Sequence, residues 1–391
     1  MVLKNVLIYT QEKEFKAGTV WIEGDRIEQI WLDEHIDCRK KTKEYESECI
    51  DGNGAYLIPG MIDIHTHGCK GYDFCDGTIE AVREMAEYLA TIGVTTFAPA
   101  TMTLPVEQLE QVLRNGAKFV REKQQGKLEI CADLAGINME GPFISSLKKG
   151  AQEEAYIIPA SVELFEQLQQ AANGLIRYVG IAPEECDAME FVRRVQKSAK
   201  VSIAHSNADY ETAMKAFRAG VRHVTHLYNA MPELKHREPG IVGAVTDCRQ
   251  VEAELICDGV HIHPAVIRAT FAMLGAERII MISDSMRAAG MPDGDYELGG
   301  QKVSVQGRLA RLEDGTIAGS VTSLPDCFRY AVREAGVPLE EAVACVTINP
   351  ARSLGIDREY GSIALGRKAD LVLLGRELEV LMVVKDGCMV K

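Results

Sequence analysis

The sequence lacks the features typical of secreted, membrane-spanning and nucleic-acid-binding proteins. Its start, MVLKNVLIYTQEKEF, has no signal-peptide core and no small-residue cleavage site, and no stretch approaches about 18 uninterrupted apolar residues. The formal net charge is −14, whereas a nucleic-acid or anionic-membrane partner requires an extended basic surface. The sequence therefore predicts a cytoplasmic protein with neither kind of partner, although a small anionic substrate would need only a few convergent cations.

Cysteine pairs and nucleophile motifs are also missing. The eleven cysteines are scattered, no C-x-x-C occurs, and the nearest two are Cys69 and Cys75. Without a signal peptide, this pattern predicts free thiols in a reducing cytoplasm and argues against structural zinc ribbons. G-x-S-x-G is absent too, so the sequence does not indicate a serine nucleophile.

What the chain does contain, between about residues 58 and 284, is an alternation of short apolar runs and amphipathic helical segments. Near-continuous apolar strands separated by helices indicate a parallel sheet that is buried on both faces. Eight such units, with no G-x-G-x-x-G after the early strands, favour an α/β fold of the closed (β/α)8 or TIM-like barrel type over an open sheet. The runs are LIPGMIDIH, VTTFAPA, CADLAGINME, LIRYVGIAP, VSIAH, VRHVTH, EAELICDG and IIMISD.

The two ends of the chain differ from this central part. Residues 1–57 and 355–391 consist of strand-like segments and turns. Neither end is long enough to bury a core alone, so we expect them to pair into one small β-sandwich domain beside a barrel of residues 58–354. A β-like insertion at about residues 296–320 follows the eighth apolar run.

Six chemically active side chains fall at the ends of five predicted strands, which would meet at the catalytic face of such a barrel. A lone histidine there could be structural, Glu140 a turn residue, and Asp284 a helix N-cap. Together, however, these residues indicate a site for a divalent ion such as Zn²⁺, Fe²⁺, Mn²⁺ or Co²⁺. The six are His65, His67, Glu140, His205, His226 and Asp284.

A metal ion beside a carboxylate indicates hydrolysis. A bound divalent ion lowers the pKa of water from about 15.7 towards about 7 and so provides a nucleophile at neutral pH. Asp284 would take the proton from that water and pass it to the departing nitrogen.

Several longer motifs resemble those of the N-acetylglucosamine-6-phosphate deacetylase family, within the amidohydrolase superfamily. They occur in the expected order over nearly the whole chain. The resemblance implies a metal-dependent barrel with a flanking β-sandwich that converts N-acetylglucosamine 6-phosphate and water to glucosamine 6-phosphate and acetate. The motifs are PGMIDIHTHG, MEGPFISSLKKGAQ, AHSNA, THLYNAM, HREPG, DGVHIHP and TIAGS.

Other functions stay open beside this one. A deacetylase for N-acetylgalactosamine 6-phosphate and an N-acyl-amino-acid or isoaspartyl hydrolase are alternatives within the superfamily. A degenerate barrel with an assembly or regulatory role is a third possibility, but such proteins lose metal ligands and all six are intact here.

The resemblance also implies a role for each site residue. Glu140, His205 and His226 would hold the main metal ion, and Asp284 would be the acid/base. His65 and His67, with Glu140, would hold a second ion, so one or two ions are expected per subunit. Arg237 would bind the phosphate from the neighbouring subunit of a homodimer. The implied substrate-binding residues are Ala151, Gln152, Asn229, Ala230, Arg237, Asp258, Gly259, Val260, His261, Ala318, Gly319 and Ser320.

One residue departs from the pattern of some family members. Gln152 stands where they have a histidine that is thought to polarise the acetyl carbonyl. Glutamine can donate a hydrogen bond but carries no charge, and a second metal ion acting as a Lewis acid could compensate. We therefore expect the strand-end pair His65 and His67 to go together with Gln152.

Overall fold

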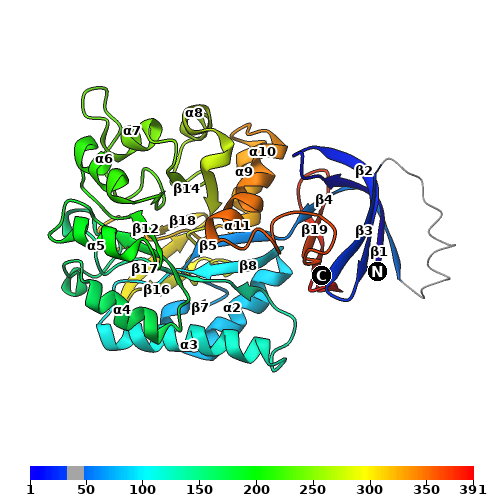
Figure 1. Cartoon of the computed structure of the whole chain (residues 1–391), viewed down its shortest axis with the longest axis horizontal. Coiled ribbons are helices and arrows are strands. Elements are labelled where there is room, and N and C mark those ends of the chain that lie inside the picture. Colours follow the sequence, from blue (N-terminus) through cyan, green and yellow to red (C-terminus); the bar gives the residue numbers. More distant parts are fainter. Residues whose placement is uncertain (33–47) are drawn as a thin grey trace.

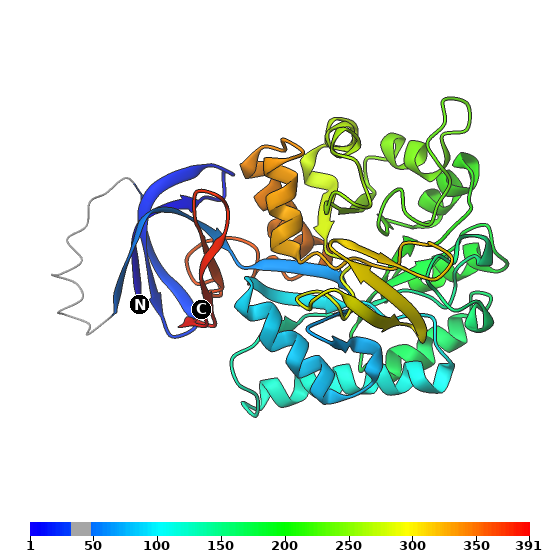
Figure 2. The same ribbon diagram turned by 180° about the vertical axis from the view of Figure 1, so that it is seen from behind.

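The computed structural model describes residues 1–32 and 48–391, which form an α/β fold in two parts (Figure 1). The larger part contains the parallel strands and the helices, and the smaller part is a sheet beside it that holds both ends of the chain (Figures 1 and 2). Residues 33–47, which include Cys38 and a piece of the predicted terminal domain, lie outside the described residues. The ten cysteines that are described are free thiols, as predicted. Among the described residues, none of the helices combines the length and the hydropathy that a membrane span requires.

Strands from both ends of the chain pair in one seven-stranded sheet. Leu57 lies opposite Leu373 in an antiparallel ladder, so segments more than three hundred residues apart are neighbours. Side chains such as Leu3, Ile22 and Leu371 form an apolar cluster of their own under this sheet. Across the sheet the order is β21 (Cys388–Met389), β20 (Val380–Lys385), β19 (Leu371–Leu374), β4 (Cys49–Pro59), β1 (Val2–Tyr9), β2 (Phe15–Glu23) and β3 (Arg26–Leu32).

Two parallel sheets form the centre of the larger part. Isolated bridges join them at both edges: Ala100 pairs with Asn138, and Thr66 pairs with Ser285, which brings the first strand beside the end of the last. This closure is consistent with the predicted barrel. One sheet contains β5 (Met61–Thr66), β8 (Val94–Pro99) and β9 (Asp133–Leu134); the other contains β10 (Ile137–Met139), β11 (Ile176–Ile181), β12 (Lys200–Ile203), β13 (His223–Val224), β14 (Glu252–Ile256) and β15 (Ile279–Ile282).

Helices separate most of these strands in the chain and surround them in space (Figure 1). Several begin at a side-chain cap: the hydroxyl oxygens of Thr78 and Ser161 accept the backbone N–H groups of Ala81 and Leu164. The helices are α2 (Ile79–Thr91), α3 (Val106–Gln124), α4 (Val162–Ala171), α5 (Ala188–Val195), α6 (Tyr210–Ala219), α7 (Gly240–Asp247), α8 (Pro264–Leu274), α9 (Leu324–Arg333), α10 (Leu339–Val346) and α11 (Ile348–Leu354).

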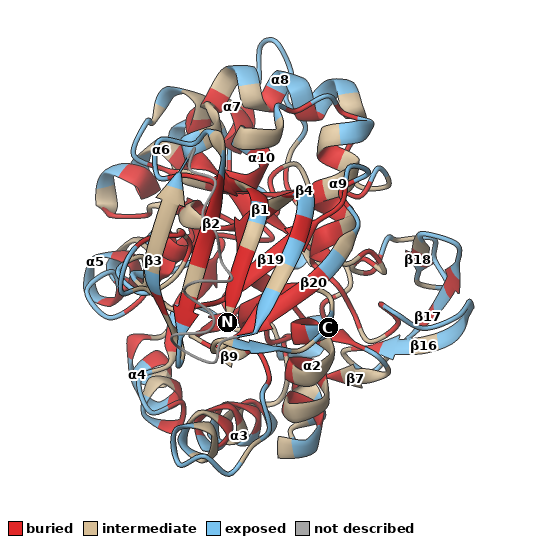
Figure 3. Cartoon of the chain, turned by 90° about the vertical axis from the view of Figure 1, so that its right-hand side faces the viewer, coloured by how far each residue is buried: buried red, intermediate tan, exposed pale blue. Residues whose placement is uncertain are grey.

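A small antiparallel sheet lies beyond the last parallel strand, within the predicted insertion. One of its faces packs Leu298, Val303 and Val305 against Met102 and Met286, and much of the rest is exposed (Figure 3). The sheet consists of β16 (Gly294–Leu298), β17 (Gln301–Gln306) and β18 (Leu309–Arg311). Shorter elements are β6 (Gly68–Cys69), β7 (Tyr72–Asp73) and the 3-10 helices η1 (Phe74–Asp76), η2 (Ser146–Lys148), η3 (Glu154–Tyr156) and η4 (Ala276–Arg278).

Candidate active site

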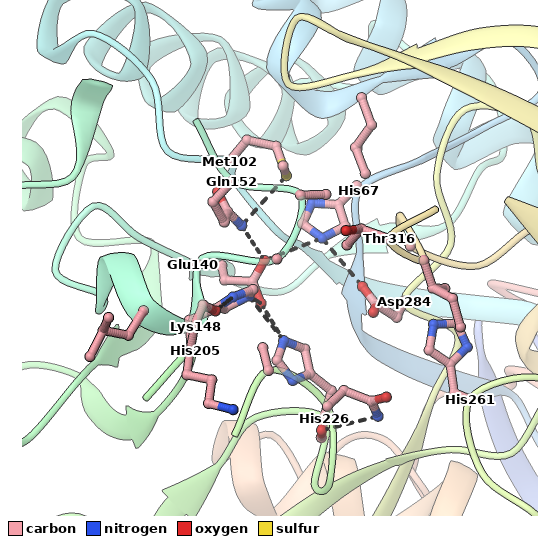
Figure 4. A pocket seen from close by; sticks show the side chains of 18 residues that line it. His67, Met102, Glu140, Lys148, Gln152, His205, His226, His261, Asp284 and Thr316 are labelled. Carbon is pink, nitrogen blue, oxygen red and sulfur yellow. Dashed lines mark hydrogen bonds and ion pairs between the residues drawn. The ribbon is translucent and has the colours of Figure 1, made fainter. Parts of the chain in front are cut away.

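The six predicted metal and acid/base residues converge at the carboxyl ends of the parallel strands. Five of them point towards one another in the close view of the cavity, which has a volume of about 390 Å³ (Figure 4). The sixth, His65, is fully buried beneath the cavity, where its ring lies against the ring of His67. The set is His65 and His67 on β5 and just after it, Glu140 after β10, His205 after β12, His226 just after β13, and Asp284 after β15.

Three of these residues have left-handed backbone conformations. The φ angles are 43° at His205, 28° at His226 and 48° at Asp284. Each residue lies two positions after the end of a parallel strand, so the chain turns sharply there and the side chain faces the cavity. Positive φ is uncommon for residues with a side chain and clusters at functional sites, because the surrounding structure must compensate for the strain.

One group of possible ligands is formed by Glu140, His205 and His226. Glu140 Oε1 lies 2.8 Å from His226 Nε2 and 3.2 Å from His205 Nε2, and the two ring nitrogens are 3.2 Å apart. His205 Nδ1 donates to the carbonyl oxygen of Lys148 at 2.9 Å, so Nε2 of a neutral ring presents a lone pair to the others. Hydrogen bonds alone would leave these three closely spaced acceptor atoms poorly satisfied, whereas a divalent ion could bind all three as ligands.

A second group is formed by His65, His67 and Asp284. Asp284 Oδ1 lies 3.3 Å from His67 Nε2 and 3.5 Å from His65 Nε2. His65 Nδ1 donates to Glu254 at 2.8 Å, and His65 Nε2 is buried without a hydrogen-bond partner. Glu140 lies between the groups, since it is also 3.4 Å from His67 and 3.5 Å from His65. These residues therefore fit a second divalent ion beside the first.

The buried carboxylates are ionised at neutral pH. Burial raises the pKa of Asp284, but the charges of His65 and His67 outweigh that effect and lower it to about 2. Burial opposes ionisation of Glu140 in the same way, and the pKa of Glu140 is nevertheless held well below its usual range by His65 and His205. Both carboxylates are thus negatively charged and available to bind a cation.

Six of the predicted substrate-binding residues line this cavity. They contribute a carboxamide from Asn229, the ring of His261 and small groups that leave room for a ligand. Apolar side chains that the sequence did not single out, Met102, Leu298 and Ile317, line the same cavity. The six predicted residues are Ala151, Gln152, Asn229, Ala230, His261 and Gly319.

Asp258 holds His261 in position, and Val260 and Ser320 bond to the same carboxylate. Asp258 Oδ2 accepts His261 Nδ1–H at 2.7 Å, and Oδ1 accepts the backbone N–H groups of Val260 and His261 at 2.9 Å. Ser320 donates to Asp258 at 3.4 Å. Gly259 has φ of 79°, which a side chain would strain. The segment therefore forms a rigid turn that presents one ring nitrogen of His261.

Two predicted residues lie elsewhere. Ala318 is buried in the apolar cluster beneath β16–β18. Arg237 lines a neighbouring cavity of about 830 Å³ in the loop before α7, and Lys148 borders both cavities. Arg237 is thus not brought to the cavity of its own chain that contains the candidate ligands.

Gln152 has a different set of contacts from those expected. Its side-chain oxygen accepts the backbone N–H of Thr103 at 2.6 Å, and its side-chain nitrogen donates to Glu140 Oε2 at 2.8 Å. Gln152 is buried and therefore holds Glu140 in position.

Glu254 belongs to the site although no sequence motif singled it out. This residue is fully buried on β14 and accepts hydrogen bonds from two residues of the site. A signal was present, because EAELI alternates glutamates with apolar residues within a strand predicted to be buried on both faces.

A third acidic group, Asp133, Asp370 and Asp386, already has its cation. Lys385 Nζ lies 2.8 Å from Asp133, 3.1 Å from Asp370 and 2.9 Å from Asp386. The lysine is fully buried, so this group needs no metal ion.

The sequence model of the amidohydrolase family matches residues 56–390, and the chain belongs to this family. It is similar to N-acetylglucosamine-6-phosphate deacetylase from Bacillus subtilis (strain 168), with 36% identity over 388 residues that cover 99% of this chain and 96% of the relative. N-acetylgalactosamine-6-phosphate deacetylase from Escherichia coli O157:H7 is 34% identical over 366 residues, covering 92% of this chain and 96% of the relative.

Solved structures are similar over the full length. N-acetyl-D-glucosamine-6-phosphate deacetylase from Mycobacterium smegmatis, a mutant in complex with N-acetyl-D-glucosamine-6-phosphate, has a TM-score of 0.89 at 31% identity, covering 100% of this chain and 99% of that one. The enzyme of the same name from Thermotoga maritima has a TM-score of 0.87 at 33% identity, again covering 100% and 99%.

Proposed function

We propose that this protein is a deacetylase that hydrolyses the acetamide group of N-acetylglucosamine 6-phosphate and releases glucosamine 6-phosphate and acetate. The observation that carries the proposal is the convergence of Glu140, His205, His226 and Asp284 on one cavity. Relatives that align with nearly the whole chain are named for this reaction.

The side chains suit the steps of amide hydrolysis. A divalent ion, Zn²⁺, Fe²⁺, Mn²⁺ or Co²⁺, would supply Lewis-acid activation of water and of the amide carbonyl when it is bound by Glu140, His205 and His226. Asp284 has a pKa of about 2 and is therefore a carboxylate at neutral pH, able to accept a proton at Oδ1 and return it to the leaving nitrogen. His65 and His67 would hold a second ion beside Glu140.

The rest of the cavity would bind the sugar phosphate. His261, fixed by Asp258, and Asn229 present polar groups to it, while Met102 and Ile317 would contact the acetyl methyl group. Arg237 would contact the phosphate bound by the other subunit of a homodimer. Its position in a separate cavity of its own chain supports this role.

The proposal also includes the fold of the protein and its cellular location. The larger part, residues 58–354, would be a closed (β/α)8 barrel, supported by the bridges at both edges of the parallel sheets. Residues 1–57 and 355–391 would form the flanking β-sandwich domain, supported by the sheet that both ends share. We place the enzyme in the cytoplasm, without a nucleic-acid or membrane partner.

An acetate-release assay tests the reaction. The substrates are N-acetylglucosamine with and without a 6-phosphate, N-acetylgalactosamine 6-phosphate and an N-acetyl amino acid, each before and after chelation. We expect release from N-acetylglucosamine 6-phosphate, loss of activity after chelation and recovery with a divalent ion. Faster release from the galactosamine epimer would favour the alternative that the 34% identical relative represents. Release only from the amino acid would contradict a sugar-phosphate substrate.

A further inference from the structure

A single buried carboxylate contacts both groups of candidate ligands. Glu254 is fully buried on β14. Its Oε2 accepts His65 Nδ1–H at 2.8 Å and the backbone N–H of His226 at 3.0 Å. Its own carbonyl oxygen accepts the N–H of Leu227 at 2.9 Å. Glu254 therefore fixes a side chain on β5 and the backbone that follows β13.

Each of these hydrogen bonds determines how a ligand is presented. Because Oε2 accepts the proton of His65 Nδ1–H, a neutral, metal-binding form of the ring would direct its Nε2 lone pair towards Glu140 and Asp284. At His226 the backbone has φ of 28°, and the bond to Glu254 holds that strained peptide so that Nε2 reaches Glu140.

The buried negative charge of Glu254 also favours a metal ion at His65. Within residues 1–32 and 48–391, this carboxylate forms ion pairs with histidines and not with lysine or arginine: His65 Nδ1 lies 2.8 Å from Oε2, and His223 Nε2 lies 3.8 Å from Oε1. Burial of a carboxylate is costly unless a positive charge compensates it, and a neutral His65 supplies none. A divalent ion held by His65, one imidazole away, reduces that cost, in the carboxylate–histidine–metal arrangement that raises the basicity of a ligand.

We propose that Glu254 is a positioning residue that prepares both ligand groups at once, through the ring of His65 and the backbone of His226. The inference rests on the proposed metal-dependent function. By contrast, the carbonyl of Lys148 orients His205 alone. Loss of Glu254 should therefore weaken metal binding at both groups.

The test is a titration of the metal-free full-length protein with Zn²⁺ in competition with a chromogenic chelator. The variants are Glu254→Gln and Glu254→Ala. Glutamine can still accept both hydrogen bonds but lacks the charge, and we expect Zn²⁺ affinity to fall about 10–100-fold. Alanine removes the acceptor and should lower the affinity at least as much at every site. If the Glu254→Ala variant does not fold, the Glu254→Gln variant still tests the inference.

Glu252→Gln is the matched control, since Glu252 lies two positions earlier on β14 and bonds to Lys200 and Ser353 instead. Thermal unfolding with and without Zn²⁺ separates the two roles: a merely structural Glu254 would lower the melting temperature of the metal-free protein and leave the gain from Zn²⁺ unchanged. Wild-type Zn²⁺ affinity in both Glu254 variants, or loss at only one group, would overturn the inference. A wild-type protein that binds Zn²⁺ but releases no acetate would contradict the proposed function and not this inference.

Discussion

At the scale of single residues, the proton transfer proposed for Asp284 can be tested apart from metal binding. Its carboxylate is ionised at neutral pH and faces His67 and His65. Asparagine has nearly the same shape but cannot accept a proton. We expect Asp284→Asn to lower kcat by about 10²–10⁴, the usual contribution of a general acid–base, with less change in KM.

This prediction is checked by steady-state kinetics together with the Zn²⁺ content of the variant. Asp326→Asn is a suitable control, because Asp326 is partly exposed and pairs with Arg329 on α9. An Asp284→Asn variant that keeps full kcat would show that another group moves the proton.

The pair His65 and His67 tests whether a second ion takes part. Gln152 donates to Glu140 in the structure and carries no charge with which to polarise the acetyl carbonyl. We expect the double variant His65→Asn/His67→Asn to lose one equivalent of bound metal and to lose most of its kcat. His263→Asn, an exposed histidine at the start of α8, is the control. Unchanged turnover with one bound ion would disprove the coupling between this pair and Gln152.

At the scale of secondary-structure elements, the strand ends could be predicted and the contacts between them could not. The eight apolar runs each contain strand residues, because fully buried parallel strands need apolar side chains on both faces. The histidines and carboxylates follow those runs directly, so their convergence could be predicted from the sequence.

What could not be predicted depends on side-chain direction and on packing between distant segments. The sequence marks Glu254 as a glutamate within a buried strand, but no pattern within β14 tells which ring on β5 it meets. The contact of Gln152 with Glu140 depends in the same way on the backbone of Thr103. Neither contact follows from spacing along the chain, because each joins separate loops and strands.

The loop between β13 and α7 carries Arg237, and its role can be tested by substrate choice. A charge-assisted hydrogen bond contributes about 1.5–3 kcal/mol, so Arg237→Ala should raise KM for N-acetylglucosamine 6-phosphate about 10–100-fold. Activity on unphosphorylated N-acetylglucosamine should change far less. Arg193→Ala, an exposed arginine on α5, is the control. An equal loss on both substrates would contradict a phosphate role.

Arg237, on the same loop, can also show whether each active site is built from one subunit or from two. If Arg237 serves the neighbouring subunit, then mixing Arg237→Ala chains with Asp284→Asn chains should restore activity, because each mixed dimer would contain one complete site. Mixtures without added activity would place Arg237 in the site of its own chain.

At the scale of the whole molecule, one buried ion cluster connects the two parts. Lys385 on β20 of the terminal sheet contacts Asp133 on β9 of the larger part and Asp370 beside β19. Lys123 on α3 contacts Asp133 from the other side at 2.7 Å. The sequence pattern of either end alone does not show this cluster, since its members come from distant parts of the chain.

Asp133 makes the stability of the molecule depend on pH. Burial raises its pKa, but Lys385 and Lys123 outweigh burial and lower it to about 2 from 3.8. A lowered pKa means that the folded state favours the carboxylate.

The stabilisation by Asp133 is therefore present above about pH 4 and disappears as the pH falls through about 2. From the size of the pKa shift, it amounts to about 2 kcal/mol. Denaturant unfolding of wild type and Asp133→Asn should show a difference in free energy that shrinks by this amount between pH 5 and pH 2. Comparison with the variant removes the contribution of Asp370, whose pKa burial raises instead. Asp295→Asn, in a surface pair with Lys302, should differ little from wild type throughout. A wild-type advantage over Asp133→Asn that stays constant down to pH 2 would show that the carboxylate at the junction of the two parts is not held ionised by its lysines.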